Sequence, residues 1–465
     1  MIDEATVVEG LEDLIARAAG GGRKLVSVTV EADVADPSAV AFASRLAADR
    51  WFCWEEPDRD GFALAALGSA YEAISRGPDR FADLTRRCAE LARGRLAAEP
   101  AELPAGAGPV WVGGMAFAPD GGAAPHWASF PPALLTLPEL SLVRHRGRTW
   151  LTACALAGAG ADPEDAVEAV RRRLASIAAR PLPLADPSPA AGTVEIASVA
   201  SPERHERAVA AAVERIRSGR LEKVVLAREI RVEAPAAHDP GALFGALREL
   251  FSSCFCFCCG SPEGAFLGAS PELLVRRSGA SAASVALAGS TRRSADPAVD
   301  DHLGQQLARS AKERAEHAIV ARRIERLLTP RSVWVEAAPE PELIRVANIQ
   351  HLATPIRAQL AEPLSTVELA GLLHPTPAVG GEPRSEALAA IADLERLDRG
   401  WYAGPVGWMD ATEDGELCVA LRSALLRDRT AHLYAGGGIV ADSDPAAELA
   451  ETEMKLEALL PLLTG

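Results

Sequence analysis

The sequence lacks the basic charge, the long apolar runs and the leader pattern that define several classes of protein. Its 48 Lys and Arg residues against 64 Asp and Glu give a formal net charge of −16. This balance argues against nucleic acid and against anionic membranes as partners, because both require a basic field. No apolar run reaches the roughly 18 residues that a spanning helix requires, and the acidic opening Met1 to Glu4 does not match a secretory leader. We therefore expect a soluble, cytoplasmic protein.

The eight cysteines also lack the arrangement of a disulfide framework. Four of them crowd into Cys254, Cys256, Cys258 and Cys259, where neighbours along a strand cannot pair. Their spacing is not the CxxC of a zinc site. Cys254, Cys256 and Cys258 would share one face of a strand, so we expect reduced thiols that serve as small apolar core residues.

The chain is long enough, at 465 residues, for one large domain or two ordinary ones. Asp162 and Asp444 each stand as an N-cap ahead of a proline at the first turn of a predicted helix. Strands arrive in consecutive groups with helices interspersed. This favours an α/β (α+β) fold, a layered sandwich with two largely antiparallel sheets flanked by helices. The predicted strands span 25–30, 110–117, 221–232, 254–259, 264–277 (around a turn), 283–287, 401–410, 416–427 and 431–434, and the predicted helices 163–180, 202–218, 312–328 and 445–460.

A proline-rich stretch at residues 180–189 cannot continue a helix. It is therefore either a domain boundary or a surface crossover inside one fold. We divide the chain near it into an N-terminal part, residues 1–195, and a second part, residues 196–465, which carries the motifs described next.

Two ionisable residues stand in apolar segments. Glu272 is the one acid in residues 266–275. It is either a carboxylate at a strand edge or a carboxylic acid whose pKa is raised by apolar surroundings, which could then donate a proton. Lys223 opens an apolar strand and is either a solvated strand end or, if it is buried near other cations, a general base with a lowered pKa.

Acidic residues share one face on each of two predicted helices. Glu313 and Glu316 lie three apart on the first helix, and Glu448, Glu451 and Lys455 share a face of the second. Ordinary surface salt bridges explain this spacing locally. Oxygen ligands from both helices would instead suit Mg²⁺ rather than zinc.

Three further features predict contacts to a small anion. Residues 436–438 are a glycine run after a strand, which either offers backbone N–H groups to a carboxylate or forms a tight turn. Arg422 interrupts an apolar strand pattern, and a buried arginine requires an anion, either a bound carboxylate or an internal Asp or Glu. His351 and His374 are by default core or turn hydrogen-bonding residues, and His351 would also suit a pyruvyl or enol group.

Together these motifs resemble the chorismate-utilising family: isochorismate synthase, salicylate synthase, and the large subunits of anthranilate and aminodeoxychorismate synthase. The resemblance runs over residues 204–460. It implies the chorismate-utilising fold, in which residues 1–195 complete the same sandwich, with chorismate as substrate and Mg²⁺ as cofactor. Isochorismate synthase is the most similar member, through residues 222–228, 266–274, 373–379 and 404–408.

The resemblance also implies roles for single residues. Lys223 matches the family's water-activating base and Glu272 its general acid, while Glu316 and Glu451 match the Mg²⁺-binding carboxylates. The implied substrate-binding residues are Gly289, Ser290 and Thr291 in a loop near the ring carboxylate, His351, Thr354, the aromatic wall Tyr402, and a clamp on the enolpyruvyl carboxylate made by Arg422, Gly436, Gly437, Gly438 and Lys455.

The implied reaction is the isomerisation of chorismate to isochorismate for menaquinone or siderophore biosynthesis. Lys223 would activate water for attack at ring C2, and Glu272 would protonate the departing C4 hydroxyl. Ammonia-using members lack a lysine at the position of Lys223, so its presence indicates water as the nucleophile, and we expect no amidotransferase subunit. We expect a monomer or a homodimer, and the sequence does not distinguish between them. Two alternatives stay open: a salicylate synthase, which also eliminates pyruvate, and a non-catalytic regulator, which would not need the acid and base pair.

Overall fold

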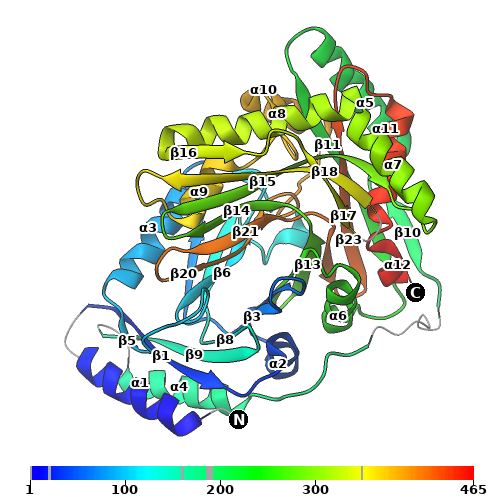
Figure 1. Ribbon diagram of the computed structural model, residues 1–465. Helices are drawn as coiled ribbons and strands as arrows, with labels where there is room; N and C mark the ends of the chain where they lie inside the picture. The colour runs from blue at the N-terminus through cyan, green and yellow to red at the C-terminus, as the bar shows by residue number, and fades with distance from the viewer. Residues whose placement is uncertain (1–2, 19–21, 159–161, 185–191, 347–348, 465) are drawn as a thin grey trace.

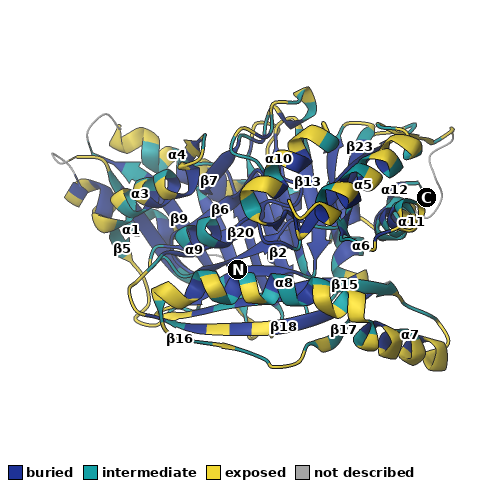
Figure 2. Ribbon diagram, turned by 90° about the horizontal axis from the view of Figure 1, so that it is seen from above, coloured by how far each residue is buried: buried dark blue, intermediate teal, exposed yellow. Residues whose placement is uncertain are grey.

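Two large sheets form a sandwich in the computed structural model, which describes residues 3–18, 22–158, 162–184, 192–346 and 349–464. One sheet has 13 strands and the other has 10. The helices cover the outer faces, so that exposed residues gather on them while the strands are mostly buried (Figures 1 and 2). Among the described strand pairs, β1 with β5 is parallel and all others are antiparallel. The predicted layered sandwich is confirmed.

Helices and strands are interspersed along the chain. The helices are α1 (Glu4–Ala18), α2 (Pro37–Ser44), α3 (Arg80–Arg93), α4 (Pro163–Ala175), α5 (Pro202–Arg217), α6 (Pro240–Leu250), α7 (Pro297–Arg309), α8 (Ala311–Leu328), α9 (Thr366–Leu373), α10 (Arg384–Leu394), α11 (Pro445–Leu456) and α12 (Leu460–Thr464), with 3₁₀ turns η1 (Pro125–Trp127) and η2 (Thr329–Arg331). The first strands are β1 (Lys24–Ala32), β2 (Trp51–Glu56), β3 (Phe62–Leu67), β4 (Tyr71–Ser75), β5 (Leu96–Ala98), β6 (Val110–Met115), β7 (Ala133–Leu137), β8 (Leu140–His145), β9 (Arg148–Ala157), β10 (Glu195–Ser198), β11 (Lys223–Glu233) and β12 (Phe255–Ser261). The others are β13 (Gly264–Ser270), β14 (Leu273–Ser278), β15 (Ser281–Arg292), β16 (Ser332–Ala337), β17 (Glu342–Val346), β18 (Ile349–Leu360), β19 (Gly381–Glu382), β20 (Pro405–Asp410), β21 (Gly415–Val419), β22 (Ser423–Arg427) and β23 (Thr430–Ile439).

Strands from both sides of the proline-rich stretch share each sheet. In the first sheet, whose order is β10-β11-β23-β22-β13-β12-β2-β3-β8-β9-β1-β5, β12 pairs with β2. In the second, ordered β16-β18-β15-β14-β21-β20-β6-β7-β4, β20 pairs with β6. The N-terminal part therefore contributes strands to both sheets. Residues 185–189 of the predicted connector lie outside the described residues.

Several predicted elements begin, end or break elsewhere. The strand expected over 416–427 is two strands, β21 and β22, in different sheets, because Arg422 between them adopts a left-handed φ of +45°. Strand β20 begins at Pro405 rather than at residue 401. The helix expected over 445–460 ends at Leu456.

The predicted helix over 163–180 ends at Ala175 because the chain turns to pack against α2. The backbone N–H of Ala178 donates to Ser44 Oγ at 2.9 Å instead of continuing the helical ladder. Its start is as predicted, since the Asp162 side chain accepts from the amides of Glu164 and Asp165.

The cysteine-rich strand lies in the core, as expected. All eight cysteines are free thiols and buried. Cys256 and Cys258 join the cluster that packs on α6, while Phe257 and Cys259 on the opposite face join the main core. A strand buried on both faces explains why apolar residues occupy every position from 255 to 259.

Helices α8 and α11 place the acidic residues of interest. Helix α8 lies over β15 and β18, and α11 lies over β23 (Figure 1). The Ser310 side chain caps α8 and the Asp444 side chain caps α11, so both helices begin at defined residues.

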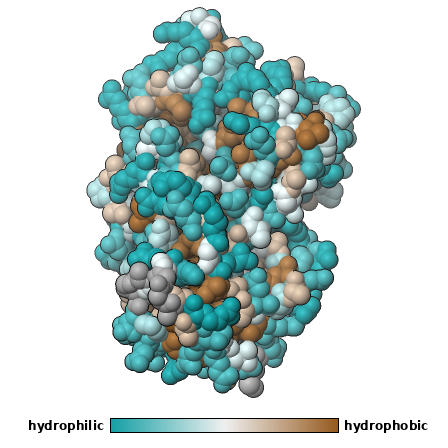
Figure 3. Space-filling view, turned by 90° about the vertical axis from the view of Figure 1, so that its left-hand side faces the viewer, coloured by the Kyte–Doolittle hydropathy of each residue, from teal (hydrophilic) through white to brown (hydrophobic). Residues whose placement is uncertain are grey.

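The outer surface is mainly hydrophilic. Apolar groups are scattered over the face in Figure 3. No helix in the described ranges is long and apolar enough to cross a membrane.

Candidate active site

A cavity with about 820 Å³ of free space, partly open to solvent, lies where strands of both sheets meet α8 and α11. It brings together eleven of the residues predicted from the sequence. These are Glu272, Gly289, Ser290, Glu316, His351, Tyr402, Arg422, Gly436, Gly438, Glu451 and Lys455. The other four, Lys223, Thr291, Thr354 and Gly437, do not line its wall.

Glu272 is held between β13 and β14 with 2% of its surface exposed. Burial raises the pKa of its carboxyl to about 8, against the opposing effects of the Lys223 charge and of a hydrogen bond from Thr376. Thr376 Oγ1 donates to Glu272 Oε1 at 3.4 Å. This direction agrees with the interpretation of Glu272 as a carboxylic acid in apolar surroundings, and its role as a proton donor stays a prediction.

Lys223 lies just behind the cavity wall at the start of β11 and is fully buried. Its Nζ lies 2.8 Å from Glu316 Oε1, although this approach does not meet hydrogen-bond geometry. The sequence analysis considered cationic neighbours for Lys223. The charged group that lies closest to its Nζ in the described contacts is instead the carboxylate of Glu316. The Nζ atom of Lys223 thus keeps hydrogen-bonding capacity that a water molecule or a ligand could use.

Three carboxylates from α8 and α11, those of Glu313, Glu316 and Glu451, line the cavity, and Glu448 lies on the same face of α11 as Glu451. Glu451 Oε1 lies 2.8 Å from Lys455 Nζ and accepts from Ser290 Oγ at 3.0 Å. Glu448 reaches Lys312 at 3.3 Å. The pKa of Glu313 is raised to about 7, first by burial and then by the charge of Glu316.

This donor set has the chemistry that a hard divalent cation prefers, although among the described residues no three of its carboxylates bring one oxygen atom each within 4.8 Å of one another. The second oxygen of Glu448, Oε2, is buried and has no hydrogen-bond partner among the described residues. Burying several carboxylates together is unfavourable unless positive charge compensates them. Oxygen ligands of this kind suit Mg²⁺. The family resemblance implies Glu316 and Glu451 as the Mg²⁺-binding carboxylates. Glu313 lies on the same face of α8 as Glu316, and Glu448 lies on the same face of α11 as Glu451.

Arg422 is partly buried and has no acidic partner. No carboxylate of the described ranges lies within ion-pair distance of it, and its NH1 atom is buried without a hydrogen-bond acceptor. Its NH2 contacts His351 Nε2 at 2.7 Å, and His351 Nδ1 contacts Gly289 O at 3.3 Å. Because unpaired burial of a cation is costly, the cavity is built to receive an anion at this point.

The glycine run is part of strand β23, so the predicted loop or tight turn is wrong. Val225 N donates to Gly380 O, away from β23, and Val225 is opposite Gly438 in the ladder. In an antiparallel pair, the amide of Gly438 therefore also points away from β11. The same holds for Gly436, whose carbonyl accepts from Lys455 Nζ at 2.9 Å.

Successive backbone amides along a strand point in opposite directions, so the three glycines do not all direct their N–H groups to the same side. Pairing with β22 covers only residues 430–433 of β23, so the edge at Gly436 and Gly438 is open toward the cavity. The amide of Gly437 faces β11 instead. The expectation of backbone donors for an anion applies to two of the three residues.

Residues 289–291 also lie in a strand rather than in the predicted loop. They continue β15, and the register with β18 shifts between Ala288 and Ser290. Gly289, with φ +77°, makes this bulge possible and lets Ser290 face Glu451. Thr291 pairs with Gln350 beyond the cavity wall.

Two more side chains bear on the geometry of the site. Thr354 Oγ1 contacts His317 Nε2 at 2.7 Å, which ties β18 to α8 beside Glu316. Tyr402 stacks on Tyr434 with ring centres 5.2 Å apart, and both line the cavity. Tyr434, His317 and Thr376 were missed from the sequence because each is an ordinary residue in an apolar or helical segment. His374 bonds to Phe117 O at 3.0 Å in the core, as its default interpretation predicted.

Substituting Gly438 with alanine is expected to lower kcat/KM by about 10²-fold, since small displacements of reacting groups have effects of this size. A Cβ here would overlap Glu316 Oε1 and lie 2.9 Å from Lys223 Cε. Gly437→Ala is the matched control, because its Cβ would lie 3.1 Å from the end of the Glu448 side chain. We expect it to reduce activity far less. Equal losses in the two variants, at equal Tm, would contradict the proposed crowding.

Comparisons with known proteins find a matching family, similar sequences and similar folds. The family described as chorismate binding enzyme matches residues 12–464. A salicylate biosynthesis isochorismate synthase of Pseudomonas aeruginosa is 38% identical over 95% of this chain and 90% of its own length. The isochorismate synthase MenF of Bacillus subtilis is 30% identical over 95% and 94%. The solved structure of MenF, the menaquinone-specific isochorismate synthase from Escherichia coli, is 26% identical with a TM-score of 0.79, covering 99% of this chain and all of that one.

Proposed function

Since this chain belongs to the family of chorismate-binding enzymes, we propose that it is an Mg²⁺-dependent isochorismate synthase that converts chorismate to isochorismate. The observation that carries the proposal is the buried, neutral Glu272 in a cavity that also holds the unpaired cation Arg422, with Lys223 just behind its wall. An acid and a base at one cavity, next to an unfilled anion site, match a reaction that moves a hydroxyl group on a dicarboxylate.

The chain's own residues account for the proton movements. Lys223 accepts a proton from water as its oxygen attacks ring C2. The ring double bonds shift, the C4–oxygen bond breaks, and Glu272 gives its proton to the departing hydroxyl, which leaves as water. Lys223 then returns its proton to solvent and Glu272 regains one, so the reaction is balanced as an isomerisation.

Charged and polar groups of the cavity fix the substrate. Arg422, Lys455 and the amides of Gly436 and Gly438 are placed to receive one carboxylate. Glu316 and Glu451, with Glu313 and Glu448 near them, would hold Mg²⁺, which supplies positive charge for the other carboxylate. Two unit charges about 4 Å apart attract by roughly 4 kcal/mol at an effective dielectric near 20. Local cations of this strength offset the net charge of −16.

The names of two similar proteins mention two different pathways. One is named for salicylate biosynthesis and another for menaquinone. We propose that isochorismate formed here enters quinone or siderophore biosynthesis, and that no amidotransferase subunit takes part, because Lys223 provides the base for water.

Proton NMR of chorismate incubated with the purified protein tests the proposal. With Mg²⁺ we expect isochorismate to accumulate toward a stable mixture without pyruvate, and with EDTA we expect no conversion. Salicylate with an equal amount of pyruvate would establish the salicylate synthase instead. Unchanged chorismate at saturating Mg²⁺ would overturn both assignments.

A further inference from the structure

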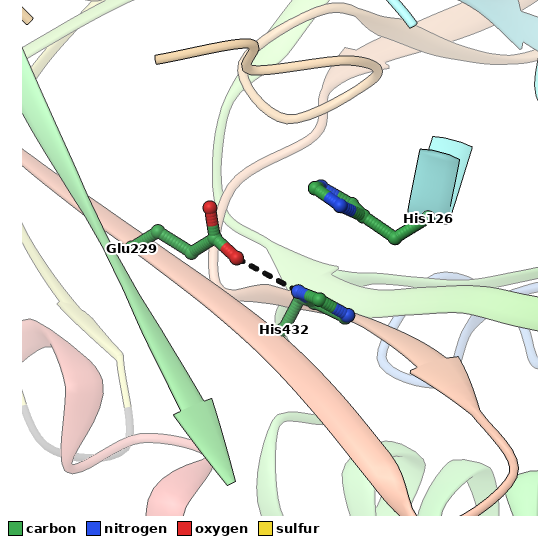
Figure 4. A group of neighbouring side chains, drawn as sticks. All are labelled: His126, Glu229 and His432. Carbon is green, nitrogen blue, oxygen red and sulfur yellow. Dashed lines mark hydrogen bonds and ion pairs between the residues drawn. The ribbon is translucent and has the colours of Figure 1, made fainter. Parts of the chain in front are cut away.

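Two histidines and a glutamate form a cluster outside the proposed reaction. His126 comes from η1, Glu229 from β11 and His432 from β23 (Figure 4). One ligand atom from each lies within 4.8 Å of the other two. Glu229 and His432 are buried, while His126 is half-buried. Among the described residues, no other group of this kind has its ligand atoms so close together.

We propose that this cluster is a second metal site, which takes a transition-metal ion such as Zn²⁺. Two imidazoles and one carboxylate are a ligand set of catalytic zinc sites, which keep a fourth position for water. Imidazole nitrogen favours Zn²⁺, Co²⁺ and Ni²⁺, whereas Mg²⁺ prefers oxygen. The ligand chemistry therefore separates this site from the all-carboxylate site at α8 and α11.

The charges around the cluster favour a cation. Glu229 is a buried acid, and its described partner is His432 Nδ1 at 2.7 Å. Asp398 lies near His126 and is held by the amides of Gly122, Ala124 and Gly400. The cation that faces these groups is Arg231, which is exposed. A divalent ion would compensate the buried carboxylate more fully than one hydrogen bond from an imidazole does.

Metal binding requires two movements: the His126 ring must turn, and Glu229 Oε1 and His432 Nδ1, which lie 2.7 Å apart, must separate. The two imidazole rings stack with centres 4.2 Å apart and planes 13° apart, so their nitrogen lone pairs lie in nearly parallel planes. Tetrahedral zinc has ligand atoms roughly 3.4 Å apart, at bond lengths of about 2.0–2.1 Å. His126 can make this change because it sits in a short turn and is half-exposed. Its ring makes one described hydrogen bond, from Nε2 to the Tyr434 hydroxyl at 3.1 Å. That contact leaves Nδ1 for the metal and provides an outer partner for the ligand.

The test uses Co²⁺ as the probe on the full chain, with Mg²⁺ at saturation so that the oxygen site is filled. We expect one equivalent of Co²⁺ to bind with visible absorption bands that Zn²⁺ abolishes. His126→Ala should weaken Co²⁺ binding at least tenfold, and Glu229→Gln should weaken it as well. His302→Ala, which removes an exposed imidazole of α7, is the matched control and should change nothing.

The outcomes are distinct from those of the chorismate experiment, because no turnover is measured. Absence of the absorption bands would overturn the site. If His126→Ala and the unaltered protein had equal Tm and bound Co²⁺ with equal affinity, the proposed site would also be overturned. A loss of binding in Glu451→Gln but not in His126→Ala would place the ion at the carboxylates and would overturn the proposal too.

Discussion

Replacing Lys223 with alanine is expected to reduce kcat for isochorismate formation by about 10³-fold, within the range that general bases contribute. Lys223 is fully buried, and its described contact with a carboxylate is Glu316 at 2.8 Å. Removing the amine leaves water without a base at the C2 face. Because Glu316 loses a competing cation, Mg²⁺ affinity should be unchanged or higher. Chorismate turnover by NMR, and Mg²⁺ titration by calorimetry, measure the two effects separately.

Two further variants test whether the loss of activity is due to the missing amine of Lys223. Lys223→Met keeps the length and packing of the side chain without the amine, so it should be as inactive as Lys223→Ala with a smaller change in Tm. Lys312→Ala removes another lysine that pairs with a carboxylate of the same group, Glu448, but Lys312 is partly exposed at the rim. We expect it to retain most of its activity. Full activity in Lys223→Met would remove Lys223 from the mechanism.

The fold was predictable where local signals and tertiary packing agree. Helices α5 and α8 combine a serine cap with a regular apolar face, and the cysteine-rich strand is apolar throughout. Prediction failed at Arg422, because the apolar pattern continues through it on both sides. Its left-handed backbone joins strands of two different sheets, and that arrangement depends on contacts far away in the sequence.

The sequence predicted most of the residues that line the cavity, but it predicted their secondary structure less well. The apolar context indicated Glu272 and the helical period indicated the acidic faces, while resemblance to a family added roles for them. The loop implied for residues 289–291 and the loop or tight turn expected at 436–438 are both strands. A glycine-rich segment suggests a turn, but a strand also uses glycine where side chains of a second layer approach closely, as Glu316 does at Gly438. The approaching atoms come from other segments, so the sequence alone contains no signal of them.

The second large effect is expected for Glu272→Gln, which should lower kcat by about 10² to 10⁴-fold, because an amide cannot replace a general acid. Glutamine keeps the size of the side chain and can still contact Thr376, so chorismate binding should change little. Glu272 must be protonated to act, and its pKa is raised to about 8, mainly by burial. The unaltered enzyme should therefore lose kcat/KM as pH rises above about 8. The residual activity of the variant should not show this loss. If the kcat/KM values of the variant and of the unaltered enzyme fell equally as pH rises above about 8, a group other than Glu272 would be responsible for the loss.

The same shift predicts a change in stability that is independent of turnover. Between the ordinary value of 4.5 and about 8, the folded state keeps a proton on Glu272 that the unfolded chain releases. The contribution of the neutral carboxyl is thus fully present below pH 4.5, and it is lost as pH rises toward 8. Glu272→Gln has no proton to lose, so its Tm relative to the unaltered protein should increase from pH 5 to pH 8 and then level off. A Tm difference that stays constant over this range would mean that Glu272 titrates normally, and it would remove the physical basis for a proton donor at this position.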